Sequence, residues 1–114
     1  MGVVRLRRPQ DFRRVWSNGR SWAHPLFVLY RLPNELAEFR IGITASRKVG
    51  NAVARNRSRR LLREAVRMLS DQISDGWDIV LVARSALLGV KEQEVEAALS
   101  QMLRRARLDV KPEA

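Results

Sequence analysis

Residues 50–67 read GNAVARNRSRRLLREAVR, and they predict a helix, from about Asn51 to Leu69, whose first turns carry positive charge. A helix N-terminus is the positive end of the helix dipole, so each cation there costs about a few tenths of a kcal/mol. Lys48, Arg55 and Arg57 all lie near that end. A bound anion would offset this cost, because free helix N–H groups and clustered guanidinium groups both bind phosphate. The repeated arginines indicate a polyphosphate partner rather than one small ligand.

At about 100° per residue, the predicted helix separates into two faces. An arc of roughly 140° is cationic, and its members are Arg55, Asn56, Arg59, Arg60, Arg63 and Arg67. A second arc of roughly 120° is apolar, and its members are Ala54, Leu61, Leu62, Ala65, Met68 and Leu69. The pattern predicts that the helix docks through the apolar arc and presents the cationic arc to a partner.

Two other interpretations of the cationic arc stay open. A solvated surface usually interleaves both signs of charge, whereas here only Glu64 is acidic, spaced for an ion pair with Arg60. A membrane-surface helix would carry large apolar residues, whereas small Ala54 and Ala65 suit packing against a sheet. Asn56 can both donate and accept hydrogen bonds, which suits contact with a sugar or a base edge.

The charge of the whole chain supports a nucleic-acid partner. The 114 residues include 22 Lys and Arg against 12 Asp and Glu, for a formal net charge of +10. Residues 1–67 hold 16 of these cations and only 4 of the acidic residues. Only three of the cations are lysines, and arginine is favoured where bidentate contact with phosphate and stacking on bases matter. The basic half of the chain is therefore the expected binding half.

Length and composition predict one domain over residues 1–114. The longest apolar run, Ile79 to Ala83, is far shorter than the about 20 residues of a membrane helix, and Met1 to Arg8 lacks the apolar core of a signal peptide. The chain has no cysteine, which fits a reducing compartment. We therefore expect a cytoplasmic protein with no membrane partner.

Hydrophobic patterns predict the remaining elements. A short helix runs from Pro9 to Asn18, and residues 26–32 and 39–44 are read as the two strands of an antiparallel hairpin. The second strand is expected to bury Phe39, Ile41 and Ile43 on one face. The continuous apolar run from Trp77 to Ala83 predicts an interior strand covered on both faces.

A last helix is predicted from Lys91 to Arg107, followed by a flexible tail over residues 108–114. Its apolar stripe consists of Val95, Ala98, Leu99, Met102, Leu103 and Ala106. The expected architecture is an α+β fold, a two-layer α/β sandwich in the order αβββαβα with a small, mostly antiparallel sheet.

Aromatic residues mark a second candidate binding surface. Phe12 and Trp16 are one helical turn apart, and Tyr30 lies on the strand next in sequence, so the three residues could line one groove. Arginines are interleaved with them, at Arg13, Arg14 and Arg31. Stacking rings beside cations suit single-stranded RNA, where each stacked base contributes about 1–3 kcal/mol. The alternative for Phe12 is a place in the core.

The sequence offers no convincing catalytic centre and no metal site. His24 is the only histidine, and it precedes Pro25, as at a strand edge. Asp71, Asp75 and Asp78 are read as a polar turn rather than as ligands for two metal ions. We therefore expect that the chain does not cleave a phosphodiester bond by itself.

Residues 46–64, SRKVGNAVARNRSRRLLRE, resemble the signature of the bacterial ribonuclease P protein subunit family. The order of the surrounding elements is also similar, beginning with Asp11-Phe12 and an aromatic residue at position 16. The family often has lysine where Arg47 and Arg59 stand and phenylalanine where Trp16 stands. These differences preserve charge and stacking ability.

The resemblance implies the protein subunit of a ribonucleoprotein endoribonuclease that removes the 5′ leader from precursor tRNA. It implies that a catalytic RNA holds the Mg²⁺ ions and cleaves, that one protein binds each RNA, and that Phe12, Trp16 and Tyr30 line a groove for the leader. It also implies the fold of a ribosomal-protein domain with a left-handed βαβ crossover. The residues assigned to the catalytic RNA or nearby phosphates are Arg47, Lys48, Asn51, Arg55, Asn56, Arg57, Arg59, Arg60 and Arg63.

Two alternatives to this function are a non-enzymatic ribosomal or other structural RNA-binding protein and a self-sufficient nuclease. Charge does not separate the first alternative from the family function, but an exposed aromatic groove would, because a structural RNA-binding protein needs no stacking track for a mobile strand. The second alternative lacks an acid/base pair in this sequence.

Overall fold

The most apolar strand lies at the centre of the sheet. In the computed structural model, which describes residues 3–113, β5 (Trp77–Ala83) lies between β3 (Phe27–Pro33) and β4 (Arg40–Ala45). Ile79, Val80 and Leu81 are at most 1% exposed although their side chains alternate between the two faces. The prediction of a strand covered on both faces is confirmed.

The sheet has five strands in the order β1-β4-β5-β3-β2, with β1 at Val4–Arg5 and β2 at Arg20–Ala23. β4 pairs in parallel with β5 and with β1, whereas β3 pairs antiparallel with β5 and with β2. The sheet is therefore mixed rather than mostly antiparallel. The element order agrees with αβββαβα after the additional strand β1.

The predicted hairpin between residues 26–32 and 39–44 is wrong. β3 and β4 do not pair with each other, because β5 is inserted between them. The turn residues after β3 permit a hairpin locally, but an interior position for β5 covers its apolar side chains more completely. The expected face of β4 is nevertheless confirmed, since Phe39, Ile41 and Ile43 all pack toward the main core.

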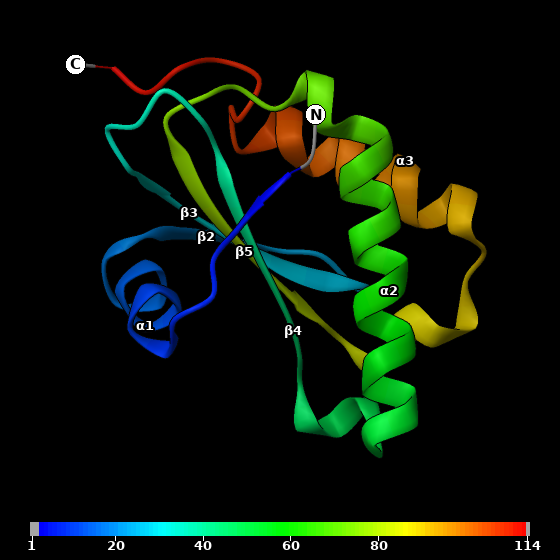
Figure 1. Cartoon of the computed structure of the whole chain (residues 1–114). Coiled ribbons are helices and arrows are strands. Elements are labelled where there is room, and N and C mark those ends of the chain that lie inside the picture. The colour runs from blue at the N-terminus through cyan, green and yellow to red at the C-terminus, as the bar shows by residue number, and fades with distance from the viewer. Residues whose placement is uncertain (1–2, 114) are drawn as a thin grey trace.

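Helices cover the two faces of the sheet unequally (Figure 1). α2 (Ala52–Leu69) and α3 (Glu92–Arg105) pack together over the main core, which includes Phe27, Leu81 and Leu99. α1 (Pro9–Asn18) covers the other face through a smaller cluster of Leu6, Val15 and Val80. Short 3₁₀ segments lie at Arg47–Val49, Ser70–Gln72 and Ser85–Gly89.

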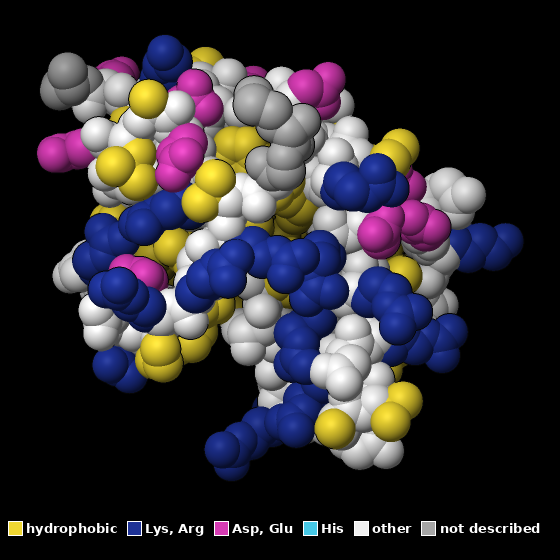
Figure 2. Space-filling view, in the orientation of Figure 1, with side chains coloured by type: hydrophobic (Ala, Val, Ile, Leu, Met, Phe, Trp, Pro, Cys, Tyr) yellow, Lys and Arg dark blue, Asp and Glu magenta, His cyan; other side chains and the backbone are white. Residues whose placement is uncertain are grey.

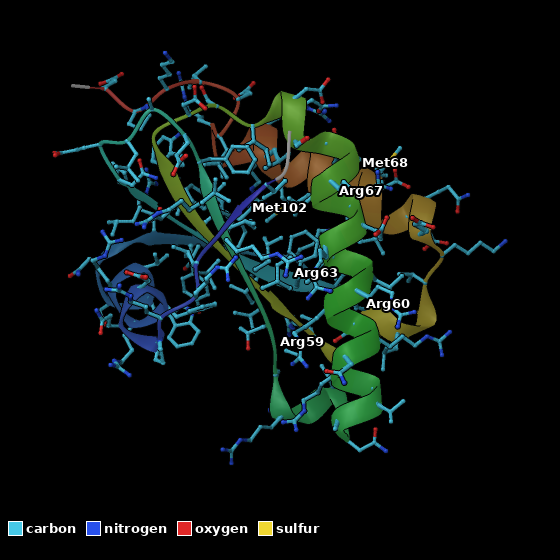
Figure 3. All side chains as sticks on the ribbon, in the orientation of Figure 1. Arg59, Arg60, Arg63, Arg67, Met68 and Met102 are labelled. Atoms are coloured by element: carbon cyan, nitrogen blue, oxygen red, sulfur yellow. The ribbon has the colours of Figure 1, made fainter. Side chains whose placement is uncertain are left out.

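α2 docks through a slightly different arc from the predicted one. Its buried residues are Ser58, Leu62, Ala65 and Val66, whereas Met68, placed on the docking arc by the sequence, is 54% exposed. Ser58 can replace an apolar residue in the contact because its hydroxyl donates to the Arg55 carbonyl at 2.9 Å. The arc is turned toward Ser58 and Val66, and Met68 points outward (Figure 3).

The chain after α3 folds back onto the sheet. Leu108 is buried, its carbonyl accepts from the Ser74 N–H at 2.8 Å, and the Trp77 indole N–H donates to the Val110 carbonyl at 2.9 Å. These contacts join residues 108–110 to the fold, and the flexibility expected for residues 108–114 stays a prediction. Ala114, like Met1 and Gly2, lies outside the described residues. No helix in residues 3–113 is long and apolar enough to cross a membrane.

Candidate nucleic-acid interface

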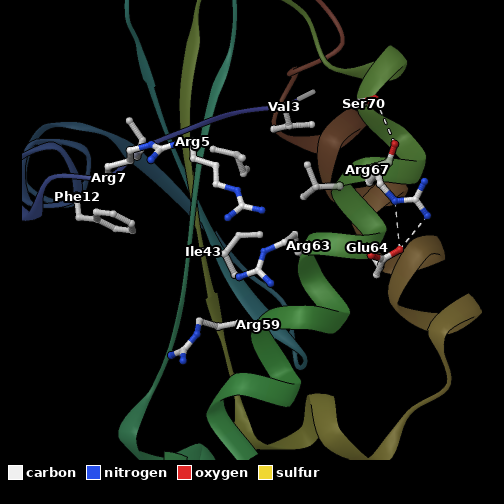
Figure 4. Close-up of a pocket in the computed structure, with 13 residues that line it drawn as sticks. Val3, Arg5, Arg7, Phe12, Ile43, Arg59, Arg63, Glu64, Arg67 and Ser70 are labelled. Carbon is white, nitrogen blue, oxygen red and sulfur yellow. Dashed lines mark hydrogen bonds and ion pairs between the residues drawn. The ribbon is translucent and has the colours of Figure 1, made fainter. Parts of the chain in front are cut away.

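A cationic groove runs between α2 and the outer edge of β4 (Figure 4). β1 pairs with β4 only at Arg40 and Ile41, so the described residues leave the rest of that edge without a strand partner. The groove has a volume of about 850 Å³. Its apolar lining comes from Val3, Leu6, Phe12, Ile41, Ile43 and Val66, and its arginines are Arg5, Arg7, Arg59, Arg63 and Arg67.

The cations of α2 divide between the groove and the outer surface. Arg59 and Arg63 point from α2 into the groove (Figures 3 and 4). Arg60 and Arg57 are exposed and do not line the groove, and Arg55 is partly buried without lining it either. Figure 2 shows Lys and Arg side chains gathered over the face that α2 shares with β4. The predicted cationic arc is thus split into a groove side and an outer side.

The single acidic residue of the groove does not neutralise these arginines. Glu64 accepts hydrogen bonds from Arg67, with the closest N–O distance at 2.9 Å, so the predicted pairing of Glu64 with Arg60 is wrong. This hydrogen bond raises the pKa of the Arg67 guanidinium. Arg59 donates to the Asn56 side-chain oxygen, which leaves the Asn56 amide N–H groups available to a partner. Within residues 3–113, Arg59 and Arg63 have no carboxylate partner.

The N-terminus of α2 is capped by a neutral group. The Asn51 side-chain oxygen accepts from the Ala54 N–H at 3.0 Å, and the Ser46 hydroxyl caps the preceding 3₁₀ segment by accepting from the Lys48 N–H at 3.3 Å. The first turn contains no acidic residue. Arg47 and Lys48 are exposed just before this end. The positive end of the helix dipole is therefore left for an external anion, and Asn51 serves first as a cap.

Two of the three predicted aromatic residues meet beside the groove. The ring centroids of Phe12 and Trp16 are 5.9 Å apart, and Trp16 is 42% exposed. A smaller hollow of about 390 Å³ joins these rings to Arg59 of α2. It is lined by Pro9, Phe12, Arg13, Trp16, Ile43, Thr44 and Arg59. Phe12 and Arg59 line both spaces, so the aromatic hollow adjoins the cationic groove.

Gly42 of β4 sets the position of Phe12. A Cβ atom at Gly42 would lie 2.7 Å from the Phe12 ring, too close for ordinary contact. The absence of a side chain at position 42 therefore allows Phe12 to lie directly on the sheet. Glycine in a strand often marks such a close approach.

Tyr30 lies on the same face of the sheet as Phe12 but outside the two hollows. It is partly buried, packs against the cluster of Leu6, Val15 and Val80, and lines neither hollow. Of the arginines interleaved with the aromatic residues, only Arg13 reaches the hollow. Arg14 and Arg31 are engaged in other contacts. Alternation along β3 turns Arg31 to the face opposite Tyr30, whereas Tyr30 and Phe12 pack against the same cluster on the α1 face.

Arg14 belongs to a buried network around Asp78. Asp78 is fully buried on β5, not in a polar turn, and it accepts from Arg14, from Arg40 at 2.7 and 2.8 Å, and from Asn34 at 2.9 Å. Burial alone would raise the pKa of the Asp78 carboxyl, but the hydrogen bonds from Arg40, Asn34 and Arg14 outweigh it and lower that pKa. The network fastens α1 to the sheet.

The groove contains residues that the sequence analysis missed. Arg5 and Arg7 reach it from the N-terminal segment, because β1 pairs with β4 and brings that segment beside α2. The only sequence signal was a cluster of cations before Pro9. Among residues 3–113, no three His, Asp or Glu side chains come together as metal ligands. The geometry suits recognition of a polyanion.

Comparison with known proteins finds relatives that match most of this chain. Residues 2–107 match the family model described as Ribonuclease P. The ribonuclease P protein component of Herpetosiphon aurantiacus is 42% identical over 104 residues, which cover 91% of this chain and 85% of the relative. That of a Roseiflexus species is 44% identical over 105 residues, covering 91% of this chain and 86% of the relative.

Solved structures show the same fold. The RNase P protein of Staphylococcus aureus superposes with a TM-score of 0.83 at 32% identity, covering 96% of this chain and all of that chain (100%). The RNase P protein of Thermotoga maritima gives a TM-score of 0.80 at 32% identity, covering 89% of this chain and 96% of that chain.

Proposed function

This chain belongs to the ribonuclease P protein family, and from that premise we propose that it is the protein subunit of the ribonucleoprotein endoribonuclease that removes the 5′ leader from precursor tRNA. Its expected partners are the catalytic ribonuclease P RNA, in a one-to-one complex, and the precursor tRNA. Family membership favours this function over that of a structural protein of the ribosome.

One observation carries the proposal: the cationic groove and the aromatic hollow share Phe12 and Arg59. A single-stranded RNA needs both kinds of contact, because its phosphates repel one another and its bases expose apolar faces. Trp16 and Phe12 offer rings for stacking, and Arg59 and Arg13 lie beside them for the phosphates. We assign the 5′ leader to this hollow. Tyr30, which lies outside it, would act only by supporting α1.

The outer cations of α2 would bind the catalytic RNA. Arg55, Arg57 and Arg60 do not line the groove, and Arg47 and Lys48 are exposed at the uncompensated end of the helix. A polyanion bound there gains from the helix dipole as well as from the arginines. Arg63 faces the groove and lies between the two proposed surfaces.

The chemical step would belong to the partner RNA. We expect the Mg²⁺ ions to be held mainly by that RNA, where they would activate the attacking water and stabilise the leaving oxygen. This chain's residues would position the leader and screen the repulsion between two polyanions. His24 is engaged structurally, since its Nδ1 accepts from the Leu26 N–H at 3.0 Å and its ring stacks on Phe27.

The proposed leader site is tested by comparing precursor and mature tRNA. In a complex of this protein with ribonuclease P RNA, Phe12→Ala should weaken precursor binding by about 1–3 kcal/mol, the contribution of one stacked base. Mature tRNA, which lacks the leader, should bind as it does to the unchanged complex. Equal losses for both ligands would remove Phe12 from the leader site and return it to a structural role.

A further inference from the structure

A second group of cations lies at the opposite edge of the sheet from the groove. Arg20 of β2 is directly opposite Arg31 of β3 in the antiparallel register. Directly opposed residues of two strands point to the same face, and like charges in that position repel. β2 is the last strand of the sheet, three strands from β4. The distance between β2 and β4 is about 14 Å at the usual strand spacing.

Two tryptophans hold the Arg31 guanidinium in place. Its central carbon lies 5.1 Å from the Trp22 ring centroid and 4.4 Å from the Trp77 ring centroid. The Arg20 guanidinium also lies against Trp22, at 5.1 Å. Trp77 is itself fixed, since it is 4% exposed and donates to the Val110 carbonyl. Cation–π contacts of this kind orient a guanidinium while leaving its N–H edge free.

The donors of these arginines are not used within the fold. Among residues 3–113, neither Arg20 nor Arg31 makes a side-chain hydrogen bond or an ion pair with a carboxylate. Arg107 adds a third charge, and burial together with Arg20 and Arg107 lowers the pKa of the Arg31 guanidinium. Two like charges with free, oriented donors and no ion pair among residues 3–113 are suited to an anion with several acceptor oxygens.

We propose that Arg20 and Arg31 form a second phosphate-binding site that holds the sugar–phosphate backbone of an RNA strand. The charge cluster and the stacked guanidinium support a phosphate ligand whatever the function of the chain. The assignment of that phosphate to RNA rests on the proposed function. Because the sheet separates this site from the groove, it binds a different RNA segment from the one in the aromatic hollow.

Salt dependence of RNA binding tests the site. The full chain carrying Arg20→Gln is titrated with ribonuclease P RNA over a range of salt concentrations, beside the unchanged protein and Arg105→Gln. Arg105 is an exposed arginine of α3 with no side-chain contact among the described hydrogen bonds, so it is a matched loss of one charge. The slope of log affinity against log salt should become shallower by about 0.7–0.9 for Arg20→Gln, as for one lost phosphate contact.

Two further variants keep the result interpretable. Arg20→Lys should retain the slope, since it retains the charge, and Arg31→Gln should lower it as Arg20→Gln does. Thermal unfolding midpoints identify any variant that fails to fold. If Arg31→Gln fails to fold, the test uses the Arg20 variants only, because Arg20 is exposed. A slope for Arg20→Gln equal to that of Arg105→Gln would overturn the second site while leaving the groove intact. Failure of the unchanged protein to bind the RNA would instead overturn the proposed function.

Discussion

At the scale of single residues, Asp78 shows how a charge inside the sheet positions the helix that carries Phe12 and Trp16. Its carboxylate is fully buried and receives hydrogen bonds from α1 through Arg14, from β4 through Arg40, and from Asn34 after β3. These contacts hold α1, which carries Phe12 and Trp16, on the sheet. Two of the chain's arginines are thereby used for structure, and net charge alone does not reveal this.

Asp78→Asn should destabilise the protein by about 3 kcal/mol, because it leaves two guanidinium groups without their carboxylate. The value is at the low end of the range for a broken buried pair, since Arg14 and Arg40 side chains are 39% and 25% exposed. Urea denaturation of the free protein measures the change. A loss below about 0.5 kcal/mol, typical of surface positions, would contradict the anchoring role.

The same network predicts an acid-sensitive stability. Because the folded state lowers the pKa of Asp78, the stabilisation is complete above the unfolded-state pKa of about 3.9 and disappears as pH falls through the folded value. The free energy of unfolding should therefore fall below about pH 4 more steeply in the unchanged protein than in Asp78→Asn. Parallel pH profiles would show that Asp78 does not contribute this dependence.

Gly42 is the second informative single residue. Gly42→Ala should push the Phe12 ring off the sheet, because the new Cβ would lie 2.7 Å from it. Precursor tRNA should then bind the complex about fivefold more weakly, the low end of one stacking interaction, with mature tRNA unaffected. Gly89→Ala is the matched control, since nothing lies within 4 Å of its Cβ position. Equal precursor affinity for Gly42→Ala and Gly89→Ala would mean that Gly42 has no role in the leader site.

At the scale of elements, α2 shows which buried residues a helical wheel predicts and which it does not. The wheel separates a docking face from a cationic face, and the structure confirms that division for Leu62 and Ala65. It places Met68 on the wrong side and leaves out Ser58, because hydropathy ranks methionine as apolar and serine as polar and does not count the hydrogen bond that Ser58 makes to its own helix. Small polar residues that bond to their own helix can be buried, and an apolar residue near a helix end can be exposed.

Leu62→Ala and Met68→Ala distinguish the observed docking face from the predicted one. Leu62 is fully buried, so its truncation should cost about 2–5 kcal/mol, whereas Met68 is 54% exposed and should cost less than about 0.5 kcal/mol. Thermal or urea unfolding of both variants measures the difference. Comparable losses would mean that α2 is rotated toward the predicted arc.

For the strands, the sequence could predict burial but not pairing. The continuous apolar run of β5 correctly predicts burial on both faces, because that signal lies within the strand itself. The pairing of β3 with β5 instead of β4 depends on contacts between residues far apart in the chain. For the same reason Arg5 and Arg7 were missed, since the pairing of β1 with β4 brings them to the groove. The signature helix could be predicted because its spacing is local.

At the scale of the whole molecule, the fold brings two different surfaces to one groove. α1 and α2 lie on opposite faces of the sheet (Figure 1). α1 supplies aromatic rings and α2 supplies guanidinium groups, and both line the hollows at the edge of β4. Neither helix alone provides both stacking and charge. We therefore propose that this edge positions a single strand of RNA for cleavage by the partner RNA.

Leader release at low Mg²⁺ tests whether this edge of the sheet positions the RNA strand. Purified protein is mixed with ribonuclease P RNA and a precursor tRNA, and the rate of 5′ leader release is measured with and without the protein. The protein should accelerate release, and Arg59→Ala with Phe12→Ala, which changes the charged and the aromatic residue that line both groove and hollow, should abolish most of the acceleration. Release at the rate of the RNA alone, with the unchanged protein folded and present, would contradict the proposed role of the protein in leader removal.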